Sequence, residues 1–144
     1  MIKGQSTDLP LAEVLRVARE VAQASDCSRL QVGAVVLDEY GAIISTGYNG
    51  AANKDLPCNV VNPAGLSDLC FCIHAEQRAI VTIPSDETPK TIYVTAFPCP
   101  SCLKLITSRG IQKVMYGDAY RYADAQGLTL ARALGLDIIQ VSMD

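Results

Sequence analysis

The central segment of the chain is a short apolar run that leads directly into two cysteines: residues 91–102 have the sequence TIYVTAFPCPSC. The first seven residues are rich in β-branched and aromatic side chains, which predicts a buried strand. The prolines on either side of Cys99 then begin a predicted helix that runs through Ser108 and stops at Gly110. Because Cys99 and Cys102 are three residues apart, both sulfur atoms can lie on one face of the first helical turn.

A second motif, Cys72-Ile73-His74-Ala75-Glu76, precedes this segment, with His74 25 residues before Cys99. One imidazole and two thiolates are three of the four ligands of a tetrahedral zinc ion, and an open fourth position distinguishes a catalytic zinc from a structural one. Glu76 is close enough to His74 to serve a zinc-bound water without being a ligand. The combination H-x-E and P-C-x-x-C is the signature of zinc-dependent nucleobase deaminases.

Hydrophobic spacing and turn residues predict the remaining elements. Residues 51–71 lack clear periodicity and contain many turn formers, so they are predicted to form a long, functional loop. The resulting α-β-β-α-β-α-β-α-β order predicts a three-layer α/β/α fold, in which a five-stranded mixed sheet has its last three strands parallel. The predicted helices cover residues 8–25, 74–83, 98–108 and 123–134, and the predicted strands cover residues 31–37, 42–48, 91–97, 111–116 and 136–141.

Length and composition indicate a single domain spanning residues 1–144. Hydrophobic residues make up 49% of the chain, a share high enough to leave apolar surface for a partner, which favours a homo-oligomer. The net charge of −3 lacks the basic excess of nucleic-acid-binding proteins, so no nucleic-acid partner is expected.

The expected location is the cytoplasm. No apolar run approaches the roughly 20 residues of a membrane span, and the N-terminal residues do not have the pattern of a signal peptide. In that compartment the six cysteines are expected to bind metal or to stay reduced rather than to form a disulfide framework.

The two motifs together predict a specific chemistry. His74 and Cys99 both fall at predicted helix starts, where unpaired amides and the helix dipole favour thiolate over thiol. Zinc lowers the pKa of a bound water to roughly 7, so hydroxide is available at neutral pH. Glu76 can take that proton and return it to a ring nitrogen and to the departing amine. The predicted reaction is therefore hydrolytic deamination of an amino-substituted heterocycle.

Three other interpretations of the cysteines and the histidine are less favoured. A redox role for Cys99 and Cys102 is disfavoured because thioredoxin-like motifs carry no paired H-x-E. A purely structural zinc would need a fourth thiol or imidazole, and His74 is the only histidine in the chain. A noncatalytic zinc-binding or partner-binding module would have no use for the carboxylate of Glu76.

The chain resembles the deoxycytidylate (dCMP) deaminase branch of the zinc-dependent cytidine deaminase superfamily over nearly its whole length. Beyond the zinc motif, the similarity rests on Gln31–Val36 (QVGAVV), Gly47–Gly50 (GYNG), Tyr93–Cys99 (YVTAFPC), Gly110-Ile111 and Tyr120. It implies a cytidine-deaminase-like fold and the conversion of dCMP to dUMP and ammonia, a step in the supply of dTTP.

The resemblance also implies roles for the motif residues. His74, Cys99 and Cys102 would hold Zn²⁺, and Glu76 would shuttle protons. The alternative is a zinc deaminase of another substrate, such as a tRNA adenosine, guanine or a modified cytosine nucleotide. A tRNA-editing enzyme should carry a basic C-terminal helix, whereas residues 123–134 contain only one arginine.

The substrate contacts follow from the same resemblance. Asn49 would hydrogen-bond the deoxyribose and Tyr120 would line the nucleotide site, although a turn residue and a packing residue are the plainer interpretations. The N–H of Ala75 can donate to the pyrimidine carbonyl. A monophosphate needs a cation, for which Arg29 and Arg121 are candidates unless they are ordinary surface arginines.

Two further expectations concern regulation and a second metal. The larger members of the family are hexamers switched by dCTP and dTTP with Mg²⁺ through a Gly-Tyr-Asn-Gly segment, which Gly47–Gly50 matches. Some relatives bind a second, structural zinc, for which Cys58, Cys70 and Cys72 are candidates; free thiols are the alternative. Cys27 is expected to be a small buried hydrophobic residue.

Overall fold

The computed structural model describes residues 11–27, 30–52, 72–118 and 123–141. Within them the helices are α2 (Leu11–Ala22), α3 (Ala75–Val81), α4 (Pro100–Ser108) and α5 (Ala125–Ala133). The strands are β1 (Gly33–Asp38), β2 (Ile43–Tyr48), β3 (Gly50–Ala51), β4 (Cys72–Ile73), β5 (Pro89–Ala96), β6 (Lys113–Asp118) and β7 (Asp137–Gln140).

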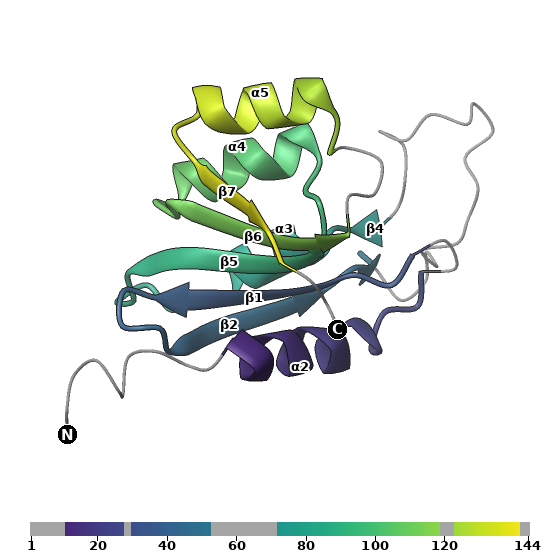
Figure 1. The fold of residues 1–144 in the computed structure, drawn as a ribbon. Coiled ribbons are helices and arrows are strands. Elements are labelled where there is room, and N and C mark those ends of the chain that lie inside the picture. Colours follow the sequence, from purple (N-terminus) through teal and green to yellow (C-terminus); the bar gives the residue numbers. More distant parts are fainter. Residues whose placement is uncertain (1–10, 28–29, 53–71, 119–122, 142–144) are drawn as a thin grey trace.

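The main sheet has five strands in the order β2-β1-β5-β6-β7 (Figure 1). Strand β1 is antiparallel to both of its neighbours, and β5, β6 and β7 run parallel to one another. The helices α4 and α5 are the crossovers between these parallel strands, as parallel pairing requires. The predicted five-stranded mixed sheet with three parallel strands is therefore confirmed.

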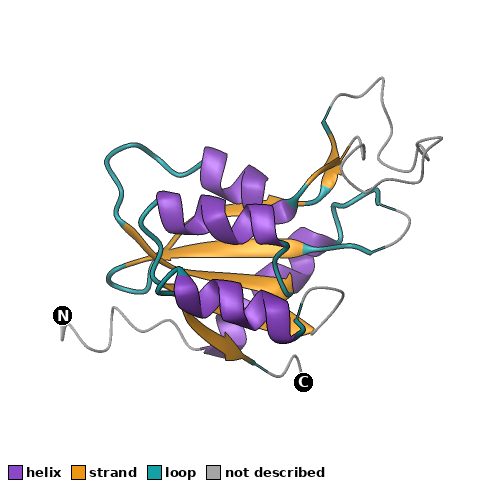
Figure 2. Ribbon diagram, turned by 90° about the horizontal axis from the view of Figure 1, so that it is seen from above, coloured by secondary structure: helices purple, strands orange, loops and turns teal. Residues whose placement is uncertain are grey.

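Helices cover both faces of the sheet, which gives the predicted three layers. Helix α2 packs on one face against β1, β2 and β5, while α3, α4 and α5 lie on the other face (Figures 1 and 2). Two buried clusters correspond to these two interfaces. The larger, which includes Ile92, Leu103, Ile106 and Val114, lies beneath α3, α4 and α5, and the smaller, built on Val14 and Tyr93, lies beneath α2.

The structure differs from the sequence-based expectation in one element. The observed bounds lie within three residues of the predicted ones, except that the predicted start of the first helix lies outside the described residues. However, Gly50–Ala51 and Cys72–Ile73 form a small antiparallel sheet that was not predicted. Two strands of two residues are too short to show an alternating pattern. This small sheet lies beyond the edge at which β2, β5 and β6 end (Figures 1 and 2).

Two glycines allow helices to approach the sheet from opposite sides. A Cβ atom on Gly33 would lie 2.2 Å from the carbonyl oxygen of Ala18 in α2. A Cβ atom on Gly47 would lie 2.4 Å from the carbonyl oxygen of Ala75 and 2.4 Å from the backbone nitrogen of Ala79, both in α3. Since these contacts are with backbone atoms, only a residue without a side chain fits at either position.

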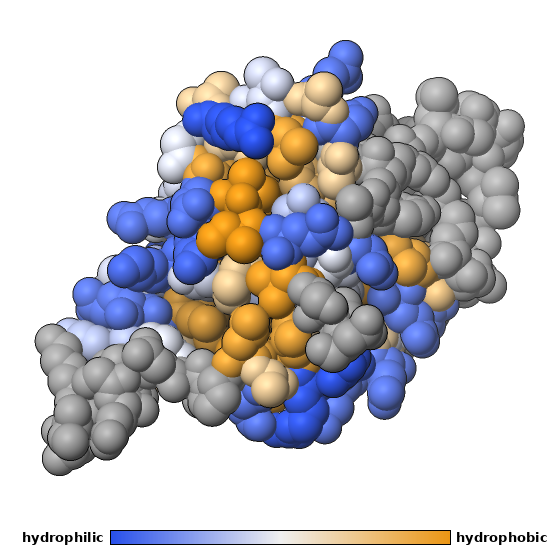
Figure 3. Space-filling view, in the orientation of Figure 1, coloured by the Kyte–Doolittle hydropathy of each residue, from blue (hydrophilic) through white to orange (hydrophobic). Residues whose placement is uncertain are grey.

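Part of the sheet face on the α2 side is apolar and only partly covered. Met115 and Val141 pack at the edge of the smaller cluster, and Ile139, the partner of Met115 across the β6–β7 ladder, is 38% exposed. Apolar side chains form a band across this side of the molecule (Figure 3). Among the described residues, no helix has the length and apolar character needed to span a bilayer.

Substitution of Gly47 by alanine tests the close packing of α3 on β2. Because the added methyl group would overlap backbone atoms of α3, we expect a loss of about 2–3 kcal/mol in the free energy of unfolding, measured by urea denaturation. Gly135→Ala is the control, because Gly135 has φ +79° and no atom within 4 Å of an added Cβ. It should lose about 1 kcal/mol through backbone strain alone. A smaller loss for Gly47→Ala than for Gly135→Ala would contradict this explanation.

Candidate metal centre and active site

Two helix starts present the predicted metal ligands. His74 follows β4 and is the N-cap of α3, and Cys99 follows β5 and is the N-cap of α4. Both residues have extended backbones, and their carbonyl groups accept the first helical hydrogen bonds, from Arg78 at 3.1 Å and from Leu103 at 2.9 Å. The N–H of His74 also donates to Oε1 of Gln77 at 2.8 Å, which fixes the entry into α3.

The side chains of His74, Cys99 and Cys102 converge on one point. Nδ1 of His74 lies 3.2 Å from Sγ of Cys102 and 3.4 Å from Sγ of Cys99. All three ligand atoms lie within 4.8 Å of one another, and no other such group of three occurs among the described residues. Zinc bonds of about 2.0 Å to nitrogen and 2.3 Å to sulfur give tetrahedral N···S edges of about 3.5 Å. The cluster therefore fits a zinc ion with three protein ligands.

Glu76 lies beside this cluster but is not part of the ligand set. Its side chain is 5% exposed, and its charge contributes to the raised pKa values of both His74 and Cys102. Burial raises the pKa of Glu76 to about 7, against the opposing effects of a hydrogen bond from its own backbone N–H and of the nearby His74. The predicted arrangement, three ligands with a carboxyl group next to them, is thus present in the structure.

The ligands are coupled through shared protons. The hydrogen bond from the Cys102 thiol lowers the pKa of Cys99 to about 4, and the contact with His74 adds to this effect. The same thiol–thiolate hydrogen bond, together with burial, raises the pKa of Cys102. The hydrogen bond with Cys99 raises the pKa of His74. These are the protons that a metal cation must displace to bind the three side chains.

Asn49 is held by the chain segment that leads into β1. Its Nδ2 donates to the carbonyl of Leu30 at 2.7 Å, and its Oδ1 accepts from the N–H of Val32 at 2.7 Å. The backbone N–H of Asn49 also donates to the carbonyl of Val32 at 3.2 Å. One amide hydrogen and one lone pair of the side chain are not used in these two bonds. These two bonds fix the orientation of the Asn49 side chain. A contact between this side chain and the substrate remains a prediction.

Some of the other residues singled out in the sequence lie within the described part of the chain, and the rest lie outside it. Ala75 is fully buried as the first residue of α3, where backbone N–H groups have no acceptor within the helix. Cys72 is disulfide-bonded and lies outside the metal cluster, so the expectation that it would bind metal or stay reduced was wrong. Cys27 is a free thiol that is half-buried, so the expectation of a buried residue was wrong. The remaining predicted residues, Tyr120, Arg29, Arg121, Cys58 and Cys70, lie outside the described residues.

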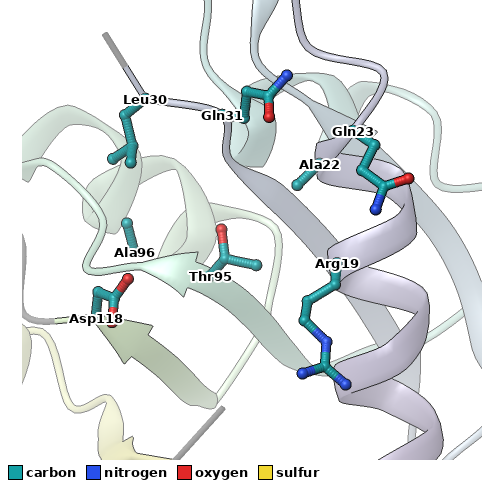
Figure 4. Close-up of a pocket in the computed structure, with 8 residues that line it drawn as sticks. All are labelled: Arg19, Ala22, Gln23, Leu30, Gln31, Thr95, Ala96 and Asp118. Atoms are coloured by element: carbon teal, nitrogen blue, oxygen red, sulfur yellow. The ribbon is translucent and has the colours of Figure 1, made fainter. Parts of the chain in front are cut away.

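A cavity of about 280 Å³ opens between α2 and the ends of β5 and β6. Figure 4 shows Arg19 on α2 and Gln23 directly after this helix, with Thr95 and Asp118 at the strand ends. Thr95 Oγ1 accepts a hydrogen bond from the N–H of Gly33 at 3.1 Å. The sequence analysis assigned no role to these four residues.

The fold and the donor set together define a zinc-binding α/β domain of the deaminase class. Residues 10–118 match the family described as the cytidine and deoxycytidylate deaminase zinc-binding region. The match covers most of the chain and includes both ligand motifs. The chain belongs to this family, and the predicted resemblance is confirmed.

Named relatives and solved structures agree with this assignment. The chain is 36% identical over 115 residues to the deoxycytidylate deaminase of Mycobacterium phage D29, an alignment that covers 71% of this chain and 89% of the phage protein. It is 30% identical over 138 residues to the deoxycytidylate deaminase of Saccharomyces cerevisiae, covering 89% of this chain but only 43% of the yeast protein. The dCMP deaminase of cyanophage S-TIM5, solved in complex with dCMP and dUMP, is similar with a TM-score of 0.71 and 29% identity, over 88% of this chain and 93% of the phage chain.

Replacing Cys102 by serine tests the metal centre. Zinc prefers thiolate to hydroxyl, so the variant should retain less than about one-tenth of the zinc of the unmodified protein, measured by elemental mass spectrometry after dialysis. Cys27→Ser is the matched control, because Cys27 is a free cysteine outside the cluster, and its zinc content should be unchanged. Equal zinc in both variants would show that the metal is bound elsewhere.

Proposed function

We propose that this protein hydrolyses dCMP to dUMP and ammonia. The observation that carries the proposal is the His74, Cys99 and Cys102 cluster with Glu76 against it, in a chain that belongs to the cytidine and deoxycytidylate deaminase family. The similarity to a phage enzyme solved with dCMP and dUMP supports the choice of substrate. The similarity to a tRNA:A34 deaminase, at 17% identity and a TM-score of 0.61, concerns the fold alone.

Each residue of the cluster has a chemical task in this proposal. His74, Cys99 and Cys102 would hold zinc, which supplies Lewis-acid activation of a water molecule. The carboxylate of Glu76 accepts one proton from the attacking water and passes it to N3 of the cytosine ring. A second proton moves through the same carboxylate to the exocyclic amine, which leaves as ammonia while C4 becomes a carbonyl. The low exposure of Glu76 keeps bulk water away from this transfer.

The substrate would be oriented by groups around the cluster. The N–H of Ala75 would donate to the pyrimidine carbonyl, and the remaining amide hydrogen of Asn49 would donate to the deoxyribose. Arg29, Arg121 and Tyr120 remain predictions for the phosphate and the nucleotide wall. Arg19, which lines the cavity at the ends of β5 and β6, is a further cation on the face of the sheet that α2 covers.

Self-association and control by nucleotides rest on other features of the chain. A homo-oligomer is supported by the partly covered apolar strip of Met115, Ile139 and Val141. Effector binding by dCTP and dTTP with Mg²⁺ rests on the sequence of Gly47–Gly50 alone. A cytoplasmic location rests only on the sequence. A second metal at Cys58 and Cys70 also rests only on the sequence, and Cys72 is not available to it as a thiolate because it is disulfide-bonded.

A substrate panel tests the proposed reaction. Zinc-loaded protein is offered dCMP, deoxycytidine, dCTP, guanine and tRNA, and ammonia release is measured for each. We expect turnover of dCMP at a kcat/KM at least about 100-fold above that of the other compounds, because a phosphate contact and a sugar contact add binding energy. Failure to turn over dCMP, with turnover of another compound, would replace the proposed substrate.

Glu76→Gln tests the proton transfer. The amide is nearly the same size but cannot accept and return a proton, so kcat should fall by about 1,000-fold or more while zinc content stays unchanged. Glu39→Gln, which changes an exposed carboxylate in the turn between β1 and β2, is the control and should keep full activity. Loss of zinc from Glu76→Gln would mean that Glu76 is a ligand and not a proton carrier.

A further inference from the structure

Arg78 lies one turn along α3 from His74 and reaches across to the end of β2. Its Nε donates to the carbonyl of Tyr48 at 2.9 Å, and its terminal nitrogen donates to the carbonyl of Ala51 at 3.3 Å. The guanidinium also lies 4.6 Å from the centre of the Tyr48 ring. A planar, always-charged group can make two carbonyl bonds and a ring contact at once, which lysine cannot do. Arg78 therefore holds both ends of the four-residue segment Tyr48–Ala51.

The rest of the contact between α3 and β2 is rigid. Gly47 lets the backbones of α3 and β2 approach closely, and Ser45 Oγ donates to the carbonyl of Ala79 at 2.8 Å. The helix that carries Arg78 is thus fixed against the strand that carries Tyr48. Since Arg78 is half-buried and its partners are backbone carbonyls of the strand end, it transmits the position of α3 to the segment beyond the strand.

The segment held by Arg78 contains Asn49. On one side, the Asn49 side chain bonds the backbone of Leu30 and Val32. On the other side, Ala51 pairs with Cys72 in the small sheet that leads directly into His74. Asn49 is therefore placed by three sets of contacts: its bonds to Leu30 and Val32, the small sheet, and the contacts of Arg78. The third set runs through a single side chain.

We infer that Arg78 is a positioning residue for the substrate: it holds Tyr48–Ala51 against α3 and so sets Asn49 at a fixed place relative to the metal cluster. This inference rests on the proposed function, in which Asn49 contacts the deoxyribose. Arg78 itself does not touch the reacting atoms. Its loss should loosen the binding of the nucleotide and leave the metal and the proton transfer in place.

Steady-state kinetics of variants at position 78 provide the first test. Arg78→Met keeps the length of the side chain and removes its charge and donors. We expect KM for dCMP to rise about tenfold, with kcat within about twofold of the unmodified protein and zinc content unchanged. Arg78→Lys, which can restore one carbonyl bond, should recover part of this loss. Arg132→Met, on the exposed side of α5, is the matched control and should not change KM. An unchanged KM in Arg78→Met, or a fall in kcat alone, would overturn the inference.

A double-mutant cycle tests whether Arg78 acts through Asn49. Asn49→Ala removes the side chain that the arginine is inferred to place. If Arg78 works only by placing Asn49, adding Arg78→Met to Asn49→Ala should raise KM by less than about twofold further. A further tenfold increase in the double variant would show that Arg78 contributes by another route and would overturn the inference.

Hydrogen exchange gives a readout that needs neither substrate nor turnover. Backbone amides in Tyr48–Ala51 should exchange about tenfold faster in zinc-loaded Arg78→Met than in Arg132→Met or the unmodified protein, with α2 unaffected. Equal exchange in this segment would overturn the inference. If Arg78→Lys is the only variant at this position that folds, the same comparison is made between Arg78→Lys and the unmodified protein. If exchange rises in Arg78→Met as expected but neither the unmodified protein nor any variant turns over dCMP, the proposed function fails while the structural role of Arg78 stands.

Discussion

The contact between Nδ1 of His74 and the two thiols of α4 joins segments that are distant in sequence and ties the sheet to its helices. It requires β4 and β5 to end close together, because His74 is the first residue after β4 and Cys99 is the third residue after β5. It also requires α3 and α4 to begin side by side. The order of strands and the direction of the parallel crossovers satisfy both requirements, so fold and donor set specify each other.

Close packing is what makes this edge rigid. Gly33 and Gly47 lie next to each other in the β1–β2 ladder region, one facing α2 and the other facing α3, and each is in backbone contact with its helix. Because helices contact the backbone of neighbouring strands from both faces of the sheet, the strand ends that follow have little freedom to move. The Asn49 side chain then joins the segment before β1 to the segment after β2. Because the N–H of Val32 donates to this side chain, β1 begins at Gly33 and not at Gln31, where the apolar pattern predicted its start.

The sequence was sufficient for the features that depend on local patterns. Apolar runs bounded by turn residues predicted the main strands, and helical apolar spacing predicted the helices. The spacing of His74, Cys99 and Cys102 predicted the cluster, because the ligand geometry is local to two helix starts. The small sheet could not be predicted, since its four residues carry no periodicity and its pairing is set by tertiary structure. The contacts of Arg78 could not be predicted either, because an arginine on a helix is usually a solvated surface residue and its partners here are backbone carbonyls of a distant strand.

The chemistry and the choice of substrate therefore depend on parts of the structure with different stability. The ligands and Glu76 are held by backbone geometry at the starts of α3 and α4 and by burial, which many contacts maintain together. Asn49 depends on a few side-chain hydrogen bonds and on the guanidinium of Arg78, each of which contributes on the order of 1 kcal/mol. If Asn49 contacts the deoxyribose as proposed, partial loosening of this edge should weaken binding of the nucleotide before it disturbs the metal. A domain built in this way can keep one reaction while its substrate range changes through the residues that surround the cluster.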